Sequence, residues 1–100
     1  MKKKVTMVGI ASGVVLGTLG FTHCSIEDIS LMRSIPGMTV ISPADCGEAF
    51  KSVFAAAKYD GPVYIRLTGG SNNPIVYNDD YNFEIGKSIK LKDGKDITIF

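Results

Sequence analysis

Three short runs of apolar and β-branched residues alternate along the chain with two segments of helical periodicity. The runs lie at residues 5–10, 39–41 and 63–67, and the helical segments lie between them. A repeated strand–helix–strand order predicts parallel strands joined by right-handed crossovers, because parallel neighbours need a connection that crosses the sheet. The expected fold class is therefore α/β, with a three-layer arrangement of a parallel sheet and flanking helices.

The first strand and the first helix have clear predicted boundaries. Residues 5–10 form a mostly apolar run that leads into glycine-rich chain, which is typical of a strand buried on both faces. Ser25 and Asp28 form a capping-box-like start for the helix, with Asp in place of the usual Glu. Pro36 and Gly37 are expected to end it.

The second helix is predicted from an N-cap and an apolar stripe. Asp45 is the predicted N-cap, and Glu48 follows it three residues later. Four apolar residues then recur at i, i+3, i+4 and i+7, which predicts that they face a core: Phe50, Val53, Phe54 and Ala57.

The character of the sequence changes after the third run. Residues 69–84 are rich in Gly, Ser, Asn, Asp and Tyr, which is typical of a linker or an extended surface segment. Residues 88–91 alternate in the manner of an exposed strand, and residues 97–100 begin another apolar strand. Because the sequence ends inside that strand, we expect the chain to be a part of a longer protein.

The N-terminus supports two interpretations. Residues 2–4 are lysines and precede an apolar stretch that reaches Thr22, as in an export signal, and Cys24 lies where a lipoprotein would carry its lipid. The residue before Cys24 is His23 rather than a small residue, and the stretch contains several glycines, each of which weakens a helix by about 1 kcal/mol relative to alanine. We therefore expect a cytoplasmic protein, with export as the alternative.

Charge and cysteine content exclude other classes. The 11 basic and 10 acidic residues leave a formal net charge of +1, which is too balanced for a typical nucleic-acid-binding protein. Cys24 and Cys46 are too few for a disulfide scaffold and are not spaced as zinc ligands. We expect two free thiols, with a single disulfide as the alternative.

Residues 20–29 carry the most specific motif of the chain. Their sequence, Gly-Phe-Thr-His-Cys-Ser-Ile-Glu-Asp-Ile, resembles the G-x-T-H-x-x-x-E-D-I motif in the pyrimidine-binding domain of transketolase-type thiamine diphosphate enzymes. The similarity continues in order through residues 32–40, 42–45 and 60–67, and residues 94–99 are similar to the start of the family's C-terminal domain. The resemblance therefore covers nearly the whole chain.

The resemblance implies a domain organisation. Residues 1–70 would be the C-terminal half of a pyrimidine-binding domain, residues 71–87 a linker, and residues 88–100 the start of the C-terminal domain. It also implies that the chain is a fragment of the split type, in which the C-terminal section is a separate subunit.

By the resemblance, His23 is the catalytic residue and also binds the substrate. A neutral imidazole can both donate and accept a proton near pH 7, which suits contact with sugar hydroxyls and with the reaction intermediate. The parent enzyme would be a transferase of carbohydrate metabolism that moves a two-carbon ketol unit between sugars with thiamine diphosphate and Mg²⁺.

The same comparison identifies motifs that this sequence lacks. Neither the G-x-A-E-Q-N segment, whose Glu activates the cofactor, nor the G-D-G…N motif, which binds diphosphate and magnesium, has a counterpart. We therefore expect the chain alone to be inactive and to bind no cofactor or metal. The expected partner is an N-terminal transketolase-type subunit or domain with the diphosphate site, in a homodimer or heterotetramer, and no nucleic acid or membrane is expected as a partner. A non-catalytic α/β interaction module and an exported lipoprotein-like chain remain the alternatives.

Three positions depart from the transketolase pattern. Gly69 stands where an arginine binds the sugar phosphate, Leu19 where an acidic residue lies, and Ala11 where a second histidine lies. Losing these groups removes charge-assisted contacts to a phosphate. We expect a sugar substrate that is different or not phosphorylated.

The remaining charged positions have structural interpretations. Glu27 and Asp28 are adjacent, so their side chains diverge on a helix, and we interpret them as first-turn acids favoured by the helix dipole rather than as paired catalytic carboxylates. Arg66, in the middle of the third strand, is expected to be structural or to lie at an interface.

Overall fold

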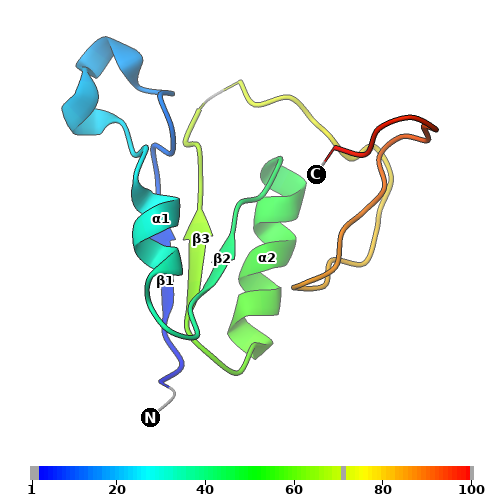
Figure 1. Cartoon of the computed structure of the whole chain (residues 1–100), viewed down its shortest axis with the longest axis horizontal. Helices are drawn as coiled ribbons and strands as arrows, with labels where there is room; N and C mark the ends of the chain where they lie inside the picture. The colour runs from blue at the N-terminus through cyan, green and yellow to red at the C-terminus, as the bar shows by residue number, and fades with distance from the viewer. Residues whose placement is uncertain (1–2, 71, 100) are drawn as a thin grey trace.

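The computed structural model describes residues 3–70 and 72–99. The elements follow the order β1 (Thr6–Gly9), α1 (Asp28–Arg33), β2 (Thr39–Ile41), α2 (Cys46–Lys58) and β3 (Val63–Arg66), with two short 3₁₀ helices, η1 (Gly17–Leu19) and η2 (Phe21–His23), between β1 and α1 (Figure 1). The predicted alternation of strands and helices is confirmed. Residues 1, 2, 71 and 100, which include the first of the three lysines, the first residue of the expected linker and the last residue of the final expected strand, lie outside the described residues.

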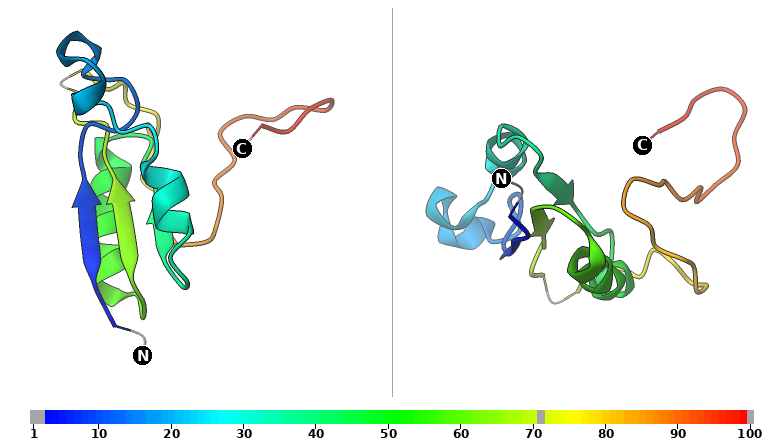
Figure 2. Two further views of the ribbon diagram at one scale, coloured as in Figure 1. Left: turned by 60° about the vertical axis from the view of Figure 1, so that its left-hand side comes forward. Right: turned by 90° about the horizontal axis from the view of Figure 1, so that it is seen from below.

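β3 is the central strand of a parallel sheet with the order β1-β3-β2. The chain passes over β3 through α1 to reach β2, and it returns through α2 in the opposite direction. Right-handed crossovers in opposite directions put their helices on opposite faces of a sheet, and α1 and α2 lie on opposite faces when the molecule is seen from below (Figure 2). The predicted three-layer α/β class is confirmed.

The hydrophobic core lies between β3 and α2. Val63 and Ile65 are fully buried and pack with Ala56 of α2 and Ile41 of β2. Because side chains alternate across a strand, the intervening residues of β3 point to the other face, toward α1. β3 therefore presents apolar side chains to one helix and polar side chains to the other.

α2 begins as predicted but packs with a different face. The Asp45 side chain accepts a hydrogen bond from the Glu48 N–H at 2.8 Å, which confirms Asp45 as the N-cap. The buried residues of the helix are Ser52 and Ala56, whose small side chains allow a close approach to the sheet. The residues predicted to face the core are not buried: Phe50, Val53, Phe54 and Ala57.

β1 forms where it was predicted, but the expectation of burial on both faces is wrong for this chain. Val5, Val8 and Ile10 are 47%, 54% and 71% exposed. The cause is the strand order, because β1 lies at an edge of the sheet and α2 packs against β3.

α1 begins later than the capping-box prediction. Its N-cap is Glu27, whose side chain makes no capping hydrogen bond. Ser25, the predicted cap, instead forms backbone bridges with Ser12 and Gly13 at the base of the preceding loop. Asp28 does lie in the first turn, as expected, but its carboxylate is bound to side chains of β3.

Residues 72–99 contain no helix or strand, and they pass alongside α2 before turning away from it (Figure 1). The prediction of strands is therefore wrong for residues 88–91 and 97–99. A strand is stabilised by ladder hydrogen bonds to a neighbour, and no residue of this segment pairs with β1 or β2. Among the described residues, no helix is both long enough and apolar enough to span a bilayer.

Candidate functional site

The long loop between β1 and α1 is attached to the carboxyl edge of the sheet at both of its ends. At its start, the Ser12 N–H donates to the Leu67 carbonyl at 3.1 Å. At its return, the Ser25 N–H donates to the Ala11 carbonyl at 3.1 Å, and the Ser25 carbonyl accepts from the Gly13 N–H at 2.7 Å. Ala11 and Gly13 have φ values of 63° and 69°, so the chain makes its turn out of β1 in the left-handed region. The loop therefore has a defined base and projects beyond the strand ends (Figure 1).

His23 is the last residue of η2 and is exposed. Its backbone N–H donates to the Gly20 carbonyl at 3.1 Å, and its ring Nδ1 lies 3.0 Å from the Thr22 hydroxyl oxygen. No described residue forms a hydrogen bond with the other ring nitrogen, Nε2. The ring thus has one nitrogen beside the hydroxyl of its neighbour and one that no described residue binds.

Two of the three loops that follow the strands come together. A Cβ placed on Gly69, after β3, would lie 3.5 Å from the Ala11 nitrogen, and one on Gly70 would lie 3.4 Å from Val15 Cγ2. At the end of the loop after β2, Asp45 binds the segment around residues 76–77. Gly69, which stands where the resemblance places a phosphate-binding arginine, therefore lies beside the loop that carries His23.

Beneath this loop, Asp28 forms a buried cluster with two side chains of β3. Its Oδ2 accepts hydrogen bonds from Arg66 Nε at 2.8 Å and from the Tyr64 hydroxyl at 3.0 Å. Burial acts to raise the pKa of the Asp28 carboxyl, but the hydrogen bonds from Arg66 and Tyr64 and the positive charge of Arg66 outweigh it, and the pKa is held below its ordinary value. Burial and the neighbouring Asp28 raise the pKa of Tyr64. Asp28 is therefore a permanent anion near neutral pH.

Sequence reasoning missed this cluster. Arg66 was expected to be structural or to lie at an interface, and its ion pair with Asp28 gives it a structural role. The only signal in the sequence is the i, i+2 spacing of Tyr64 and Arg66, which puts both side chains on one face of a strand. That spacing does not identify the residue they meet on the opposing helix.

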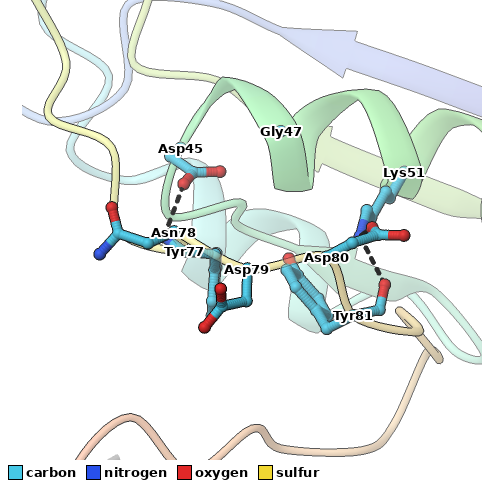
Figure 3. Close-up of a pocket in the computed structure, with 8 residues that line it drawn as sticks. All are labelled: Asp45, Gly47, Lys51, Tyr77, Asn78, Asp79, Asp80 and Tyr81. Atoms are coloured by element: carbon cyan, nitrogen blue, oxygen red, sulfur yellow. Dashed lines mark hydrogen bonds and ion pairs between the residues drawn. The ribbon is translucent and has the colours of Figure 1, made fainter.

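A second cluster lies on the flank of α2, where the segment 76–81 packs (Figure 3). The Asp45 Oδ2 accepts hydrogen bonds from the backbone N–H groups of Val76 at 2.9 Å and Tyr77 at 3.1 Å. The Glu48 N–H, followed by these two donors, holds the pKa of the Asp45 carboxyl below its ordinary value. Lys51 lies 3.9 Å from the centroid of the Tyr81 ring and pairs with an aspartate of the segment.

Two hollows in the described part of the molecule, one on the flank of α2 and one at the amino edge of the sheet, are not lined by His23. The first is bounded by Asp45, Gly47, Lys51 and the segment 77–81. The second is bounded by parts of β1 and by the turns around residues 36–38 and 59–62. We therefore assign the candidate site to the loop of His23 rather than to either hollow.

Both cysteines are free thiols, as expected from the sequence. Cys24 is half-buried, with its Sγ 3.4 Å from the Gly20 carbonyl, and Cys46 is exposed at the start of α2. Among the described residues, no group of three or more His, Cys, Asp or Glu side chains gathers in a way that could hold a metal ion.

The fold and the loop define a parallel α/β protein whose candidate site lies beyond the carboxyl ends of its strands. The family model described as "Transketolase, pyrimidine binding domain" matches residues 1–73. The chain belongs to the transketolase family and corresponds to part of its pyrimidine-binding domain, as the motif at residues 20–29 predicted.

Several curated relatives are similar over almost the whole chain. A subunit of the apulose-4-phosphate transketolase of Phocaeicola vulgatus is 41% identical over 98% of this chain and 31% of its own length. The 6-deoxy-6-sulfo-D-fructose transketolase subunit SqwH of a Clostridium species is 45% identical over 95% of this chain and 29% of its own length. A putative transketolase C-terminal section of Methanocaldococcus jannaschii is 39% identical over 98% of this chain and 31% of its own length.

Among solved structures, a split gene transketolase described as an inactive beta4 tetramer is similar, with a TM-score of 0.76 and 38% identity. The match covers 95% of this chain and 29% of that chain. The matches cover 29–31% of the length of the curated relatives, so the chain spans about a third of their length.

Proposed function

We propose that this chain is part of a transketolase-type enzyme that transfers a two-carbon ketol unit between sugars, and that it contributes His23 to the reaction centre. The position of His23 carries the proposal: the residue lies in the family motif and is exposed on a loop that is anchored at both ends to the carboxyl edge of the sheet. The boundaries expected from the sequence, with a linker from residue 71 and a further domain from residue 88, belong to this proposal, as does a cytoplasmic location.

His23 would act through its imidazole nitrogens. With Nδ1 near the Thr22 hydroxyl, the ring can present Nε2 to a sugar hydroxyl and donate or accept a proton there. A group of this kind contributes about 10²–10⁴-fold to a proton-transfer step.

The described residues do not fit the diphosphate and Mg²⁺ end of thiamine diphosphate. No set of three possible metal ligands gathers among them, and the buried carboxylate nearest the loop, Asp28, is already bound by Arg66 and Tyr64. The proposed partner is therefore a subunit or domain with the diphosphate site, in a homodimer or heterotetramer. The relatives named as subunits support this division.

The sugar is proposed to differ from the usual pentose phosphates. Gly69 has a φ of 72°, a left-handed conformation that an arginine would adopt only with strain. Because residue 69 is a glycine, this position offers no guanidinium beside the loop of His23. Two relatives are named for unusual sugars, apulose 4-phosphate and 6-deoxy-6-sulfo-D-fructose, which supports a divergent substrate.

The test is ketol transfer by the longer enzyme that contains this segment, assembled with its diphosphate-binding partner. His23→Asn should lower the rate by about 10²–10⁴-fold and leave cofactor binding unchanged. Lys58→Ala, at the exposed end of α2, is the matched control and should have no effect. Full activity of His23→Asn would contradict the role of His23, and an assembled wild-type enzyme without ketol transfer would contradict the function, as expected for a non-catalytic interaction module.

A second measurement tests the division of the cofactor site. Calorimetry of this chain alone with thiamine diphosphate and Mg²⁺ should give no binding heat. Micromolar binding would show that the chain carries a diphosphate site of its own.

A further inference from the structure

Arg66 connects the central strand, β3, to two points: Asp28 in the first turn of α1 and Ser25 at the base of the loop. Its Nε donates to Asp28 Oδ2 at 2.8 Å, and its Nη2 lies 3.4 Å from the Ser25 carbonyl oxygen. The Asp28 and Arg66 side chains are only 8% and 17% exposed. A guanidinium holds several donors in one rigid plane, so it can contact a carboxylate and a carbonyl at the same time.

Ser25 is the point at which these contacts meet the loop of His23. Its carbonyl accepts from the Gly13 N–H as well as from Arg66, and its N–H donates to the Ala11 carbonyl. The two ends of the loop are thus joined to each other and, through Arg66, to β3. His23 lies two residues before Ser25, so a shift of this base moves the ring.

None of the hydrogen bonds among the described residues joins Asp28 or Arg66 to His23. The two side chains therefore act on His23 only through the backbone of Ser25 and the start of α1. Tyr64 differs from them, because its hydroxyl binds Asp28 but not the loop.

We propose that Asp28 and Arg66 are positioning residues for His23, and that the Arg66–Ser25 contact fixes the height of the loop above the sheet. Its catalytic consequence rests on the proposed function, whereas its structural part stands without it. A displacement of about 1 Å at a catalytic group can cost about 10²-fold in rate, so a contact of this kind matters to the reaction even though it lies beneath the site.

Amide hydrogen exchange of this chain, followed by NMR, tests the structural part. Arg66→Lys keeps the positive charge but replaces the planar fork with a single ammonium, which cannot hold Asp28 and Ser25 in the same geometry. We expect the amides of Gly13 and Ser25 to exchange at least about tenfold faster. The amides of Ala49 in α2 and of Tyr59 at its C-terminal cap should change less than about threefold.

Tyr64→Phe is the matched control, because it removes one hydrogen bond from Asp28 and leaves the Arg66–Ser25 contact in place. Once exchange is compared at equal global stability, Tyr64→Phe should accelerate exchange of the loop amides less than Arg66→Lys does. If Arg66→Lys does not fold, Asp28→Asn, which releases Arg66 from its charged partner, should give the same selective pattern. Uniform acceleration of all amides, or unchanged exchange at Gly13 and Ser25, would overturn the proposal.

A kinetic cycle on the longer enzyme tests the link to His23. Arg66→Lys should lower kcat by about 10–100-fold in the wild-type background and have no further effect in a His23→Asn background, because it acts through that ring. Equal effects in both backgrounds would show a general structural role and contradict positioning. An inactive wild-type enzyme would contradict the proposed function, while the exchange experiment would still decide whether Arg66 fixes the loop.

Discussion

Gly9→Ala tests the close approach of β1 to the cluster beneath the loop. A Cβ at position 9 would lie 2.2 Å from the Tyr64 hydroxyl oxygen and 2.9 Å from its Cζ. Non-bonded heavy atoms rest at about 3.5 Å or more, so the tip of the ring would have to move by about 1 Å. Tyr64 is buried and donates to Asp28 at 3.0 Å. The movement would therefore strain the packing around the ring or break that hydrogen bond.

Two opposing terms set the size of the effect. Overpacking of a well-packed site costs about 1–3 kcal/mol, whereas replacing glycine by alanine removes chain entropy from the unfolded state and returns about 0.4–1 kcal/mol. We expect Gly9→Ala to lower the free energy of unfolding by about 1–2 kcal/mol. With a urea m-value of about 1 kcal/mol/M, the unfolding midpoint measured by far-UV circular dichroism should fall by about 1–2 M.

Two further variants separate this contact from other effects of the substitution. Tyr64→Phe removes the atom that the new methyl group meets first, so Gly9→Ala should cost about 1 kcal/mol less in that background. Gly17→Ala is the matched control, because a Cβ there meets no atom within 4 Å, and stability should change by less than about 0.5 kcal/mol. An equal cost of Gly9→Ala in the presence and absence of the Tyr64 hydroxyl, or a Gly9→Ala variant as stable as Gly17→Ala, would refute the reasoning.

Buried polar groups give three further predictions. Asp45→Asn should leave the start of α2 in place but make the amides of residues 76–77 exchange about tenfold faster, as measured by NMR. The substitution replaces one carboxylate oxygen with an amide NH₂, and Oδ2 accepts both of these N–H groups. Unchanged exchange would contradict the contact. Ser12→Ala should leave the free energy of unfolding, measured from the urea midpoint, unchanged or raise it by up to about 1 kcal/mol. The reason is that the buried hydroxyl has no hydrogen-bond partner among the described residues. A clear loss of stability would contradict this and reveal a partner. The pKa values of Asp28 and Asp45 lie below their ordinary value of 3.8. Their contribution to stability is therefore present above that pH and is lost as the pH falls through the lower folded-state pKa values. The urea midpoint should drop between pH 6 and pH 3, and the drop should be smaller in Asp28→Asn than in the wild-type chain.

The order of the elements could be predicted because it depends on local patterns, whereas burial could not. The periodicity of α2 identified a stripe of large apolar residues, but the helix packs with Ser52 and Ala56. Val63 and Ile65 of β3 are fully buried beneath it, and small side chains let the helix axis approach them. The Ser52 hydroxyl remains satisfied at 2.7 Å by the Ala49 carbonyl, so its burial carries little penalty. A hydrophobicity pattern distinguishes the faces of a helix, but the opposing strand decides which of them packs.

The two helix-start aspartates show the same limit at the candidate site. Asp45 caps α2 as predicted because its long-range donors, Val76 and Tyr77, use Oδ2 and leave Oδ1 for the Glu48 N–H. Asp28 lies in the first turn of α1, after the N-cap Glu27, and its Oδ2 is bound by side chains that lie 36 and 38 residues later on β3. A charge-assisted bond from a guanidinium is about twice as strong as one between neutral groups, so the pair with Arg66 sets where this carboxylate lies, while its buried Oδ1 has no hydrogen-bond partner among the described residues. Sequence spacing can place an aspartate at the start of a helix, but it does not identify a partner on a distant strand, and at Asp28 that partner, Arg66, is what ties the loop of the candidate histidine to the centre of the sheet.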